Sequence, residues 1–506
     1  MSQSRINRLS RLAALLIPLA WHASAASAAT QFDAGGGTQW WFNPTNWSVD
    51  QLPPNNLTVG TVTDVQVNLD PNFTGSTGLG VVYDPSPADP GFAAAVGATY
   101  PAGYSAQKIA QLYVGRNTSA NPLLTIRGDL QADNIQVGRS SGVAGTFTTG
   151  RINQVSGTVL VVPGQAFDIG AADTSNPGSG NGIYDYQGGI LSVGASGATN
   201  AVRMAHGSTN DADGSSGEGR IIVRNPGTPG HVRFGSVAMS SYRGINDMAT
   251  TAADPNGTTT GVSVFEFHYG NGGTRPIQVA GSLSINNGFH AGFESTTSAR
   301  LDFRLDSAVT LAAGGAAPIN LGLIDVDYSA DDFVSGIISG SGTNGGLLSS
   351  ADGSALLTEG AMVSAIFGTT KYNWQISYTG EITWSNLDAS VVASVTPGTA
   401  GTNRDLVLLG HSIETVVVPN NADFNGDLKV DGADFVIWQR NLGVGTLQTQ
   451  GDANGDGAVN AADLGVWRTK FGQPVALGAA GAVPEPASAA LAALACVAAA
   501  TLRRRD

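Results

Sequence analysis

Val114-Gly115-Arg116 recurs as Val137-Gly138-Arg139, and the strand-like segments ending in Ile169-Gly170 and Val193-Gly194 follow the same pattern. The four glycines are 23, 32 and 24 residues apart. A spacing of about 24 residues, with one insertion, is typical of one turn of a parallel β-solenoid, which holds two or three short strands. Glycine permits the tight bend at a corner. One turn cannot bury its own apolar face, so we predict a right-handed parallel β-solenoid whose core comes from stacking.

The repeat is clearest over residues 100–240 and fades over 260–410. Apolar β-branched runs continue there, for example Val262–Phe267 and Asp405–Leu409, with turn residues such as Asn271-Gly272-Gly273 between them. Short strands bounded by glycine are also typical of an antiparallel β-sandwich. The prediction for residues 30–418 is therefore mainly β: a solenoid, with a β-sandwich pair as the alternative in the second half.

The composition favours strands and turns over helices. The chain has 506 residues, of which 68 are glycine, and only 13% are charged, which is about half the usual ~25%. Exposed helix faces need Lys, Glu and Arg, so this composition argues against a helical enzyme. The formal net charge of −14 argues against nucleic acid as a partner, because phosphate binding needs a basic face. The single cysteine, Cys496, cannot form an intrachain disulfide.

Aromatic residues cluster near the start of the β region. Trp40-Trp41 and Asn46-Trp47-Ser48 precede Thr63-Asp64-Val65, and the segments Tyr372–Tyr378 and Asn403–Leu408 come near its end. These segments resemble the opening and closing strands of autotransporter-like β-helical surface proteins. The resemblance implies a passenger-type β-helix and names no activity. The three tryptophans are expected to cap the open end of the solenoid, where strand edges must be covered; a sugar-stacking platform is the alternative.

A duplicated acidic loop follows the β region. Residues 423–434 read Asp-Phe-Asn-Gly-Asp-Leu-Lys-Val-Asp-Gly-Ala-Asp, and residues 452–463 read Asp-Ala-Asn-Gly-Asp-Gly-Ala-Val-Asn-Ala-Ala-Asp. The same alignment continues beyond the loops, where Trp438 matches Trp467. Oxygen-bearing side chains occupy loop positions 1, 3, 5 and 12 in both copies, and position 7 offers a backbone carbonyl. This is the spacing of an EF-hand loop, which surrounds Ca²⁺ with about six to eight oxygens.

The pair of loops resembles the type I dockerin module, whose two loop–helix halves are related by a pseudo-twofold axis. The resemblance implies a helical module that folds around calcium, with a cohesin-like protein as its partner. Position 12 is Asp, as in that family, rather than the Glu of calmodulin-like loops. The predicted calcium ligands, side chain or carbonyl, are Asp423, Asn425, Asp427, Lys429, Asp434, Asp452, Asn454, Asp456, Ala458 and Asp463.

The loops depart from the dockerin pattern at two places. Leu428 occupies position 6, where glycine permits the sharp turn, so the first site is expected to bind calcium more weakly. Positions 10 and 11 usually carry Ser or Thr for contact with cohesin, but here they are Gly432-Ala433 and Ala461-Ala462. The first departure concerns the strength of the metal site, and the second concerns the choice of partner.

Both ends of the chain carry targeting features. Residues 1–29 combine arginines, a short apolar run and Ala-x-Ala cleavage sites, which is typical of a secretory signal peptide. Near the other end, Val483-Pro484-Glu485-Pro486 precedes the apolar run 487–502 and Arg503-Arg504-Arg505. This tail, 483–506, resembles the PEP-CTERM sorting signal; a plain C-terminal anchor is the alternative. The resemblance implies a membrane-spanning helix, a transient stay in the inner membrane, processing by an exosortase-type enzyme, and delivery to the cell surface or extracellular matrix.

Catalytic motifs are sparse, and no catalytic residue is predicted. The sequence has no G-x-S-x-G elbow, P-loop or H-E-x-x-H pairing. Carboxylates two residues apart on a strand share one face, and such pairs serve sugar hydrolysis. The candidate groups are Asp211 with Asp213, Asp325 with Asp327, Asp331 with Asp332, and Glu266 with His268. We favour solvated carboxylates on an acidic surface for all of them, with Glu266 and His268 at the polar rim of a turn.

The predicted order of parts is a signal peptide (1–29), a β-solenoid passenger (30–418), a dockerin-like module (419–475), a linker (476–482) and a sorting tail (483–506). The favoured function is a secreted, non-catalytic structural or adhesive protein of the surface or matrix. The alternative is an extracellular polysaccharide-degrading enzyme, a glycoside hydrolase or lyase displayed through its dockerin. Such an enzyme needs a cleft with two or more carboxylates within about 10 Å.

Overall fold

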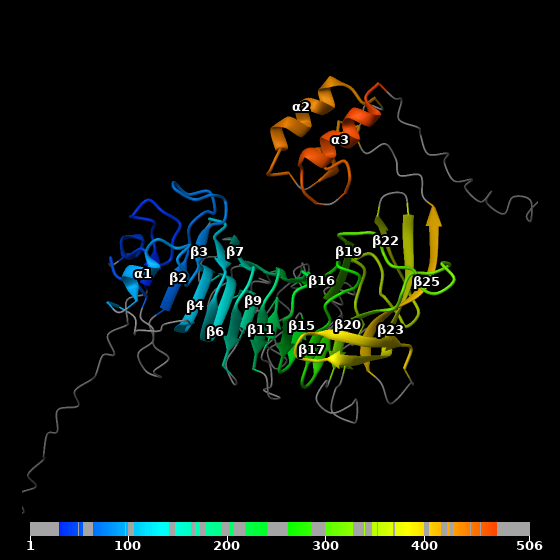
Figure 1. The fold of residues 1–506 in the computed structure, drawn as a ribbon, viewed down its shortest axis with the longest axis horizontal. Helices are drawn as coiled ribbons and strands as arrows, with labels where there is room; N and C mark the ends of the chain where they lie inside the picture. Colours follow the sequence, from blue (N-terminus) through cyan, green and yellow to red (C-terminus); the bar gives the residue numbers. More distant parts are fainter. Residues whose placement is uncertain are drawn as a thin grey trace, which may run out of the picture.

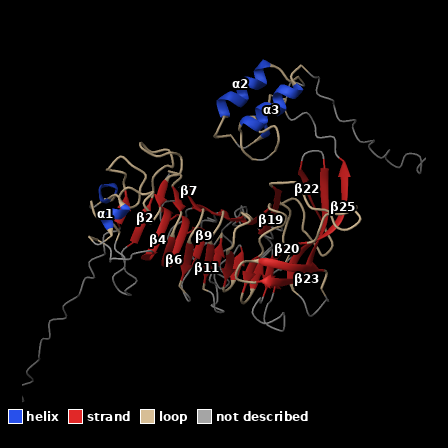
Figure 2. Ribbon diagram, in the orientation of Figure 1, coloured by secondary structure: helices blue, strands red, loops and turns tan. Residues whose placement is uncertain are grey.

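The described residues form a long β region and a small helical module in the computed structural model (Figure 1). The structure describes residues 30–48, 50–53, 64–96, 98–99, 106–116, 118, 120–140, 147–162, 167–172, 179–194, 202–205, 218–239, 262–285, 299–326, 338–339, 347–351, 353–367, 370–398, 404–415, 422–425, 429–445, 447–455 and 457–472. The predicted signal peptide, linker and sorting tail lie outside these residues. The mainly β prediction is confirmed (Figure 2).

Most strands belong to three rows whose neighbours are parallel. The first row contains β1 (Thr30–Phe32), β2 (Asp64–Val67), β4 (Ala106–Arg116), β6 (Asp129–Ser140), β9 (Phe167–Ala172), β12 (Val202–Met204), β15 (Val237–Met239), β18 (Leu283–Ile285) and β21 (Ile338–Ser339). The second row branches from the first at β6, which pairs with β8. It contains β8 (Thr158–Val161), β11 (Ile190–Val193), β14 (His231–Phe234), β17 (Ile277–Val279) and β20 (Leu321–Val326). The third row contains β3 (Val81–Tyr83), β5 (Leu123–Ile126), β7 (Phe147–Gln154), β10 (Ser179–Tyr186), β13 (Glu218–Val223), β16 (Val262–Tyr269) and β19 (Ala299–Leu305).

The chain visits the three rows in a fixed order. From β7 onward each strand of the third row is followed by one of the second and one of the first, as in β7–β8–β9 and β10–β11–β12. Segments far apart in sequence therefore become neighbours: Glu218 in β13 pairs with Asn181 in β10 and with Val262 in β16. This order agrees with the predicted two or three short strands in each repeat.

The structure corrects the last position of the glycine repeat. Gly115, Gly138 and Gly170 do align along the first row, in β4, β6 and β9. The residue that follows them in this row is Ala205, directly after β12. Gly194 instead follows β11, a strand of the second row. The near-regular spacing in the sequence was misleading because the loops between strands differ in length, so equivalent corners do not recur at a fixed interval.

Two of the aligned glycines show why the corner excludes a side chain. Gly138 has φ +64° and Gly170 has φ +67°, in the left-handed region. A Cβ on Gly138 would lie 1.9 Å from the carbonyl oxygen of Asn181, and one on Gly170 would lie 2.0 Å from that of Glu218. Both backbone conformation and space therefore require glycine at these corners.

Parallel pairing continues past residue 260, where the sequence repeat fades. β16 pairs with β19, β17 with β20 and β18 with β21, all in parallel. Antiparallel pairs begin after this point, among β22 (Met362–Phe367), β23 (Thr370–Asn386), β24 (Val391–Thr396) and β25 (Asp405–Thr415), and β25 also pairs with β20. The sandwich alternative was therefore wrong for the described strands between residues 262 and 339, and antiparallel strands close that end of the β region (Figure 1).

Aromatic side chains fill the opposite end of the core. Trp41 and Trp47 are fully buried, and their ring centroids lie 4.8 Å apart in an edge-to-face contact. Phe32 packs edge to face on Trp47 at 5.1 Å, and Tyr83 on Trp41 at 5.4 Å. This packing agrees with the predicted cap, because edge-to-face aromatic pairs add to the stabilisation from burial. Trp40, in contrast, is only half-buried.

Helices are short in the described part of the chain, and none of them is long and apolar enough to cross a membrane. α1 (Phe92–Ala95) lies near the aromatic end, whereas α2 (Gly432–Asn441) and α3 (Ala461–Lys470) belong to the module. The short 3₁₀ segments are Pro44–Asn46 and Gln448–Gln450. The module has a hydrophobic core of its own, separate from that of the β region; its buried residues are Ala422, Phe424, Val430, Trp438, Ala453 and Val459.

Candidate functional site

Each acidic loop of the module ends in a capped helix. The Asp431 carboxylate accepts a hydrogen bond from the Ala433 N–H (2.7 Å) before α2, and the Asn460 side chain accepts one from the Ala462 N–H (2.7 Å) before α3. Asp434 and Asp463 return the contact to the backbone N–H of these capping residues (2.8 and 2.7 Å). Such a reciprocal capping box satisfies donors at the start of a helix.

The carboxylates at loop position 12 also hold the beginnings of the loops. Asp434 Oδ1 accepts hydrogen bonds from the N–H groups of Phe424 (2.7 Å) and Asn425 (3.3 Å). Asp463 Oδ1 accepts the equivalent bonds from Ala453 (2.8 Å) and Asn454 (3.1 Å). Both carboxylates are fully buried. Each position-12 carboxylate therefore joins the two ends of its loop, and the two halves share this arrangement at equivalent positions of the duplication.

The two halves of the module are also joined by hydrogen bonds from each half to the loop of the other. The Trp438 indole N–H donates to the carbonyl of Asn460 (2.8 Å), and the Trp467 indole N–H donates to the carbonyl of Asp431 (3.1 Å). The backbone shows the same exchange, because Gly443 donates to Val459 and Gly472 donates to Val430, both at 2.9 Å. The sequence aligned the two tryptophans, but it did not reveal that each one reaches the loop of the other half.

The donor set of the loops fits a hard divalent cation. Asp423 and Asp452, at position 1, are only 8% and 4% exposed, and Asp452 accepts hydrogen bonds from the N–H groups of Gly455 (2.8 Å) and Gly457 (2.9 Å). Buried carboxylate oxygens are the ligands that Ca²⁺ prefers. The other described predicted ligands, all exposed, are Asn425, Lys429, Asn454 and Ala458.

Two of the predicted ligands, Asp427 and Asp456 at position 5, lie outside the described residues, as does Leu428. Among the residues that are described, no group of three acidic, histidine or cysteine side chains is placed to hold a metal ion. In each loop the structure thus describes two of the three predicted carboxylates, those at positions 1 and 12.

The two loops are expected to differ in calcium affinity. We predict that Asp452→Ala lowers the calorimetric calcium affinity of the module more than Asp423→Ala, because Leu428 already weakens the first loop where the second has Gly457. Gly457 has φ +80°, a conformation that leucine rarely adopts. Titration calorimetry on both variants compares the losses directly, and equal losses would reject the asymmetry.

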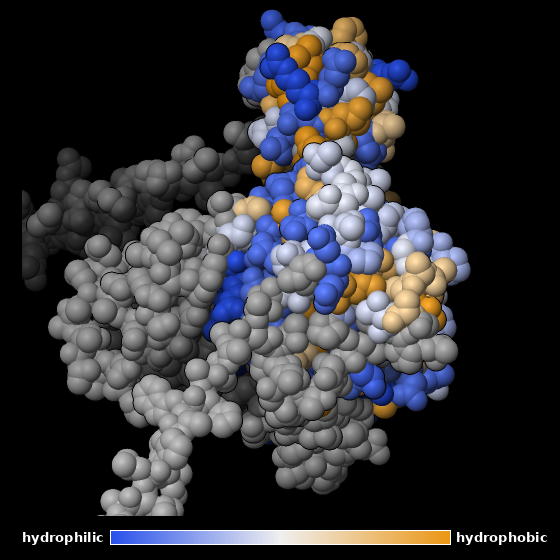
Figure 3. All heavy atoms as spheres, turned by 90° about the vertical axis from the view of Figure 1, so that its left-hand side faces the viewer, coloured by the Kyte–Doolittle hydropathy of each residue, from blue (hydrophilic) through white to orange (hydrophobic). Residues whose placement is uncertain are grey.

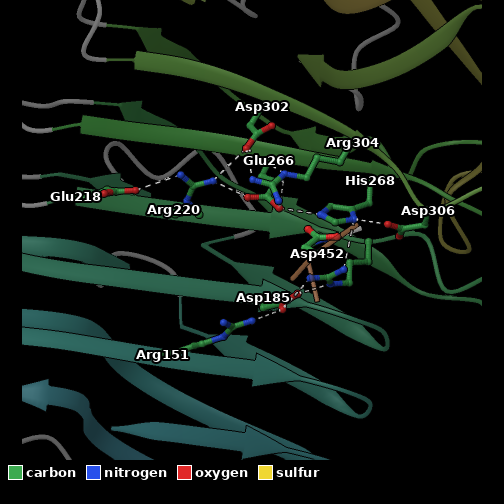
Figure 4. A network of polar contacts seen from close by, with 12 residues as sticks. Arg151, Asp185, Glu218, Arg220, Glu266, His268, Asp302, Arg304, Asp306 and Asp452 are labelled. Carbon is green, nitrogen blue, oxygen red and sulfur yellow. Dashed lines mark hydrogen bonds and ion pairs between the residues drawn. The ribbon is translucent and has the colours of Figure 1, made fainter. Parts of the chain in front are cut away.

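A second polar cluster lies on the outer face of the third row, and we call it the charged strip; Figure 4 shows it. Its members are Arg220, Arg224, Glu266, His268, Asp302, Arg304 and Asp306. These residues come from β13, β16 and β19 or directly follow them, and the parallel register places Glu266 beside Asp302 and His268 beside Arg304. Sequence reasoning noticed Glu266 and His268 but missed the arginines, which lie on other strands far away in the sequence.

The strip pairs its carboxylates with arginines. Arg220 Nη1 lies 2.5 Å from Glu266 Oε2 and 3.3 Å from Asp302 Oδ2. Arg304 contacts the same two carboxylates, at 3.3 Å to Glu266 Oε1 and 2.9 Å to Asp302 Oδ2. Two carboxylates held by two arginines are unsuited to proton transfer, since the guanidinium groups stabilise the charged form. The prediction that Glu266 is a solvated rim carboxylate was therefore wrong, because the residue is only 4% exposed and is held by two arginines.

His268 joins the strip to Asp306. Its Nε2 lies 2.8 Å from Glu266 Oε1 and its Nδ1 lies 2.7 Å from Asp306 Oδ1. Burial acts most strongly on the pKa of His268 and would lower it, but the hydrogen bonds to Asp306 and Glu266 outweigh burial and raise the pKa. For Glu266, burial alone would raise the pKa, yet His268 and the two arginines lower it from 4.5 to about 2.

These shifts predict how the stability of the β region depends on pH. The raised pKa of His268 means that its contribution is complete below the ordinary pKa of about 6.5 and is lost as the pH rises through the folded-state value. We therefore expect His268→Gln to flatten the fall in the free energy of unfolding between pH 6 and pH 9, measured with denaturant. The exposed His411 supplies the control His411→Gln, and an unchanged fall in His268→Gln would contradict the prediction.

The other candidate carboxylates form no described cluster. Asp211, Asp213, Asp327, Asp331 and Asp332 lie outside the described residues. Asp325 is described: it is 2% exposed and accepts a hydrogen bond from the Trp384 indole N–H. The prediction that Asp325 is a solvated carboxylate was therefore wrong, and the contact gives it a structural role between β20 and β23.

A pocket of about 510 Å³ lies beside Trp40 at the aromatic end of the β region. Its lining is mostly apolar, with Phe42, prolines and alanines, and it contains no acidic side chain. Two of its polar members, Thr38 and Asn43, are hydrogen-bonded to each other (3.2 Å). The pocket therefore lacks the carboxylate pair that sugar hydrolysis needs.

Comparison with known families identifies the module. Residues 421–467 match the dockerin type I domain, which confirms that part of the sequence prediction. Domains of this family bind calcium, occur in extracellular proteins and typically bind cohesins. No curated protein and no solved structure matches the chain.

Proposed function

We propose that the protein is a secreted structural or adhesive component of the cell surface or extracellular matrix, built as a right-handed β-solenoid that carries a calcium-dependent docking module. The observation that carries the proposal is the reciprocal pair of loop–helix halves within residues 421–467, attached to a long β region. A docking module gives the protein a means of attachment, and the β region supplies length and rigidity.

The stacked rows support a role as a rigid spacer. Parallel neighbours in a row are about 4.8 Å apart, so the nine strands of the first row, β1 to β21, span about 40 Å. Every turn contacts only its neighbours in such an array, and the core continues from one turn to the next. We propose that this shaft holds the module away from the surface to which the protein is delivered.

Calcium would be held by the ten predicted ligands of the two loops. The metal supplies positive charge that offsets the repulsion between the carboxylates of each loop. Asp434 and Asp463 then do two things: they hold the loop backbone, as the structure describes, and they offer carboxylate oxygen to the ion. Since each half closes the other through Trp438 and Trp467, occupancy of one loop supports the geometry of the second.

A cohesin-like protein is the proposed partner of the module. Hydrophobic side chains reach the surface of the module (Figure 3), and the large exposed ones are Val436, Leu442, Val444, Leu447 and Phe471. Exposed apolar groups of this size are typical of protein-binding surfaces. Because positions 10 and 11 are Gly or Ala, we propose that binding relies on apolar contact rather than on hydroxyl hydrogen bonds.

The proposed route to the surface uses both ends of the chain. Residues 1–29 would direct export, and the tail 483–506 would hold the protein in the inner membrane until an exosortase-type enzyme processes it. This route fits the proposed order of parts, which is signal, solenoid (30–418), module (419–475), linker (476–482) and tail. An extracellular polysaccharide remains the proposed ligand of the β region in the adhesive role.

A panel of plant and algal polysaccharides tests the proposal against the enzymatic alternative. The proposal expects the mature chain to sediment with matrix from the producing cells in millimolar calcium, to be released by chelator, and to produce no new reducing ends. Reducing ends that appear with the purified wild type and not with an identically prepared sample lacking the protein would establish a glycoside hydrolase or lyase instead. Equal sedimentation in millimolar calcium and in chelator would overturn the role of the module.

A further inference from the structure

We propose that the charged strip is a docking surface for the second loop of the protein's own module, so that the module folds back onto the β region. The loop meets the strip at Gly457, where an added Cβ would lie 3.6 Å from Nη1 of Arg304. Figure 4 draws Asp452, the first residue of this loop, among the labelled side chains of the strip. These contacts join segments that are about 150 residues apart, which is roughly the length of a typical domain.

The strip is unusually dry for an outer face. Glu266 and His268 alternate along β16 with Phe265 and Phe267, which are core residues, so the two polar side chains point outward. They are nevertheless only 4% and 5% exposed. These exposures are those of the chain with the module in place, so the contacts between loop and strip lie where water is largely excluded and electrostatic attraction is stronger.

The strip can accept an acidic loop, because its three arginines balance its three carboxylates and His268 adds a positive charge when protonated. The side chain of Arg304 is 48% exposed, so its guanidinium is the cation that the strip offers to an approaching group. The second loop contains three carboxylates, Asp452, Asp456 and Asp463, and these outnumber the two charges of one Ca²⁺ ion. The loop therefore stays acidic with calcium bound, so it can contact Arg304 both with and without calcium.

The tether is short enough to keep the module near the strip. β25 ends at Thr415 and the described module begins at Ala422, so the connection reaches at most about 25 Å. β25 and β22 both pair with β23, and β22 contacts β19, the strand of Arg304. A short tether raises the effective concentration of the module at the strip to about the millimolar range, so weak contacts suffice for docking.

Distances between two spin labels in the full mature chain test this docking. The labels are placed at Ala316→Cys, in the β region, and Thr469→Cys, in α3; the processed chain has no other cysteine, because the single native one, Cys496, lies in the tail. At low salt and in millimolar calcium we expect a narrow distance distribution. Arg304→Glu should broaden it by removing the cation, and Ala458→Trp should broaden it by placing bulk next to Gly457. The second variant leaves the β region untouched, so its effect does not depend on how well Arg304→Glu folds.

Arg127→Glu is the matched control. Arg127 directly follows β5 in the same row of strands and pairs with Asp84, so the substitution changes the charge equally but away from the strip. It should leave the narrow distribution unchanged, and about 1 M salt should broaden the wild-type distribution by screening. A broad distribution in the wild type, or a narrow one that survives both Arg304→Glu and Ala458→Trp, would overturn the proposal.

Discussion

The isolated fragment 419–475 is expected to unfold when calcium is removed and to fold again when calcium is restored. Its core contains few buried hydrophobic residues, and a module of about 55 residues is marginal without disulfides or metal. The carboxylates of Asp434 and Asp463 are fully buried, next to loops that contain further acidic groups. Without a cation this concentration of negative charge opposes the fold, whereas a ligand that binds only the folded state stabilises it by about 4 kcal/mol at a thousand times its Kd.

Circular dichroism of the fragment measures this directly, since α2 and α3 supply its helical signal. Chelator should abolish the signal, and millimolar calcium should restore it with a much higher Tm. The double variant Asp434→Ala, Asp463→Ala should lose the response to calcium. Asp431→Asn is the control, because it removes one charge at loop position 9 yet keeps a capping side chain, as Asn460 does in the other half. An identical Tm in chelator and in calcium would show that metal does not organise the module.

The module was predictable because its determinants are local. A single short segment contains all the oxygen groups of one loop, and its duplication in register shows that the pattern is not accidental. The structure places Asp434 and Asp463 at the ends of their loops, as the spacing indicates. The exchange between Trp438 and the loop of the other half required the angle between the helices, which depends on packing and not on spacing.

The β region was predictable in its strands but not in its rows. Alternation and turn residues identify individual strands, whereas pairing depends on loops of unequal length. Arg220 and Arg304 lie at different distances in sequence from Glu266, one before it and one after it, yet all three occupy one strip. Gly194 is a second example. The regular spacing predicted that it continues the first row, but Ala205 holds that position and Gly194 follows a strand of the second row. Polar clusters across turns therefore needed the three-dimensional register.

Replacing Gly138 by alanine is expected to destabilise the β region severely. The residue has φ +64°, and left-handed backbone costs a non-glycine residue about 1–2 kcal/mol. In addition, the new Cβ would lie 1.9 Å from the carbonyl oxygen of Asn181 in β10. That oxygen belongs to a strand fixed by parallel pairing on both sides, so it cannot move without disturbing adjacent turns. We expect a loss of about 4 kcal/mol or more, which is exceptional for one substitution.

Gly272→Ala separates the two parts of this loss. Gly272 has φ +82°, but no atom lies within 4 Å of its would-be Cβ. This variant should therefore show only the backbone cost of about 1–2 kcal/mol. Denaturant unfolding of both variants measures the difference, which is the cost of separating β6 from β10 at the corner. If the two substitutions cost the same, the close approach of β6 and β10 contributes nothing to stability, and glycine at this corner is needed for its backbone conformation alone.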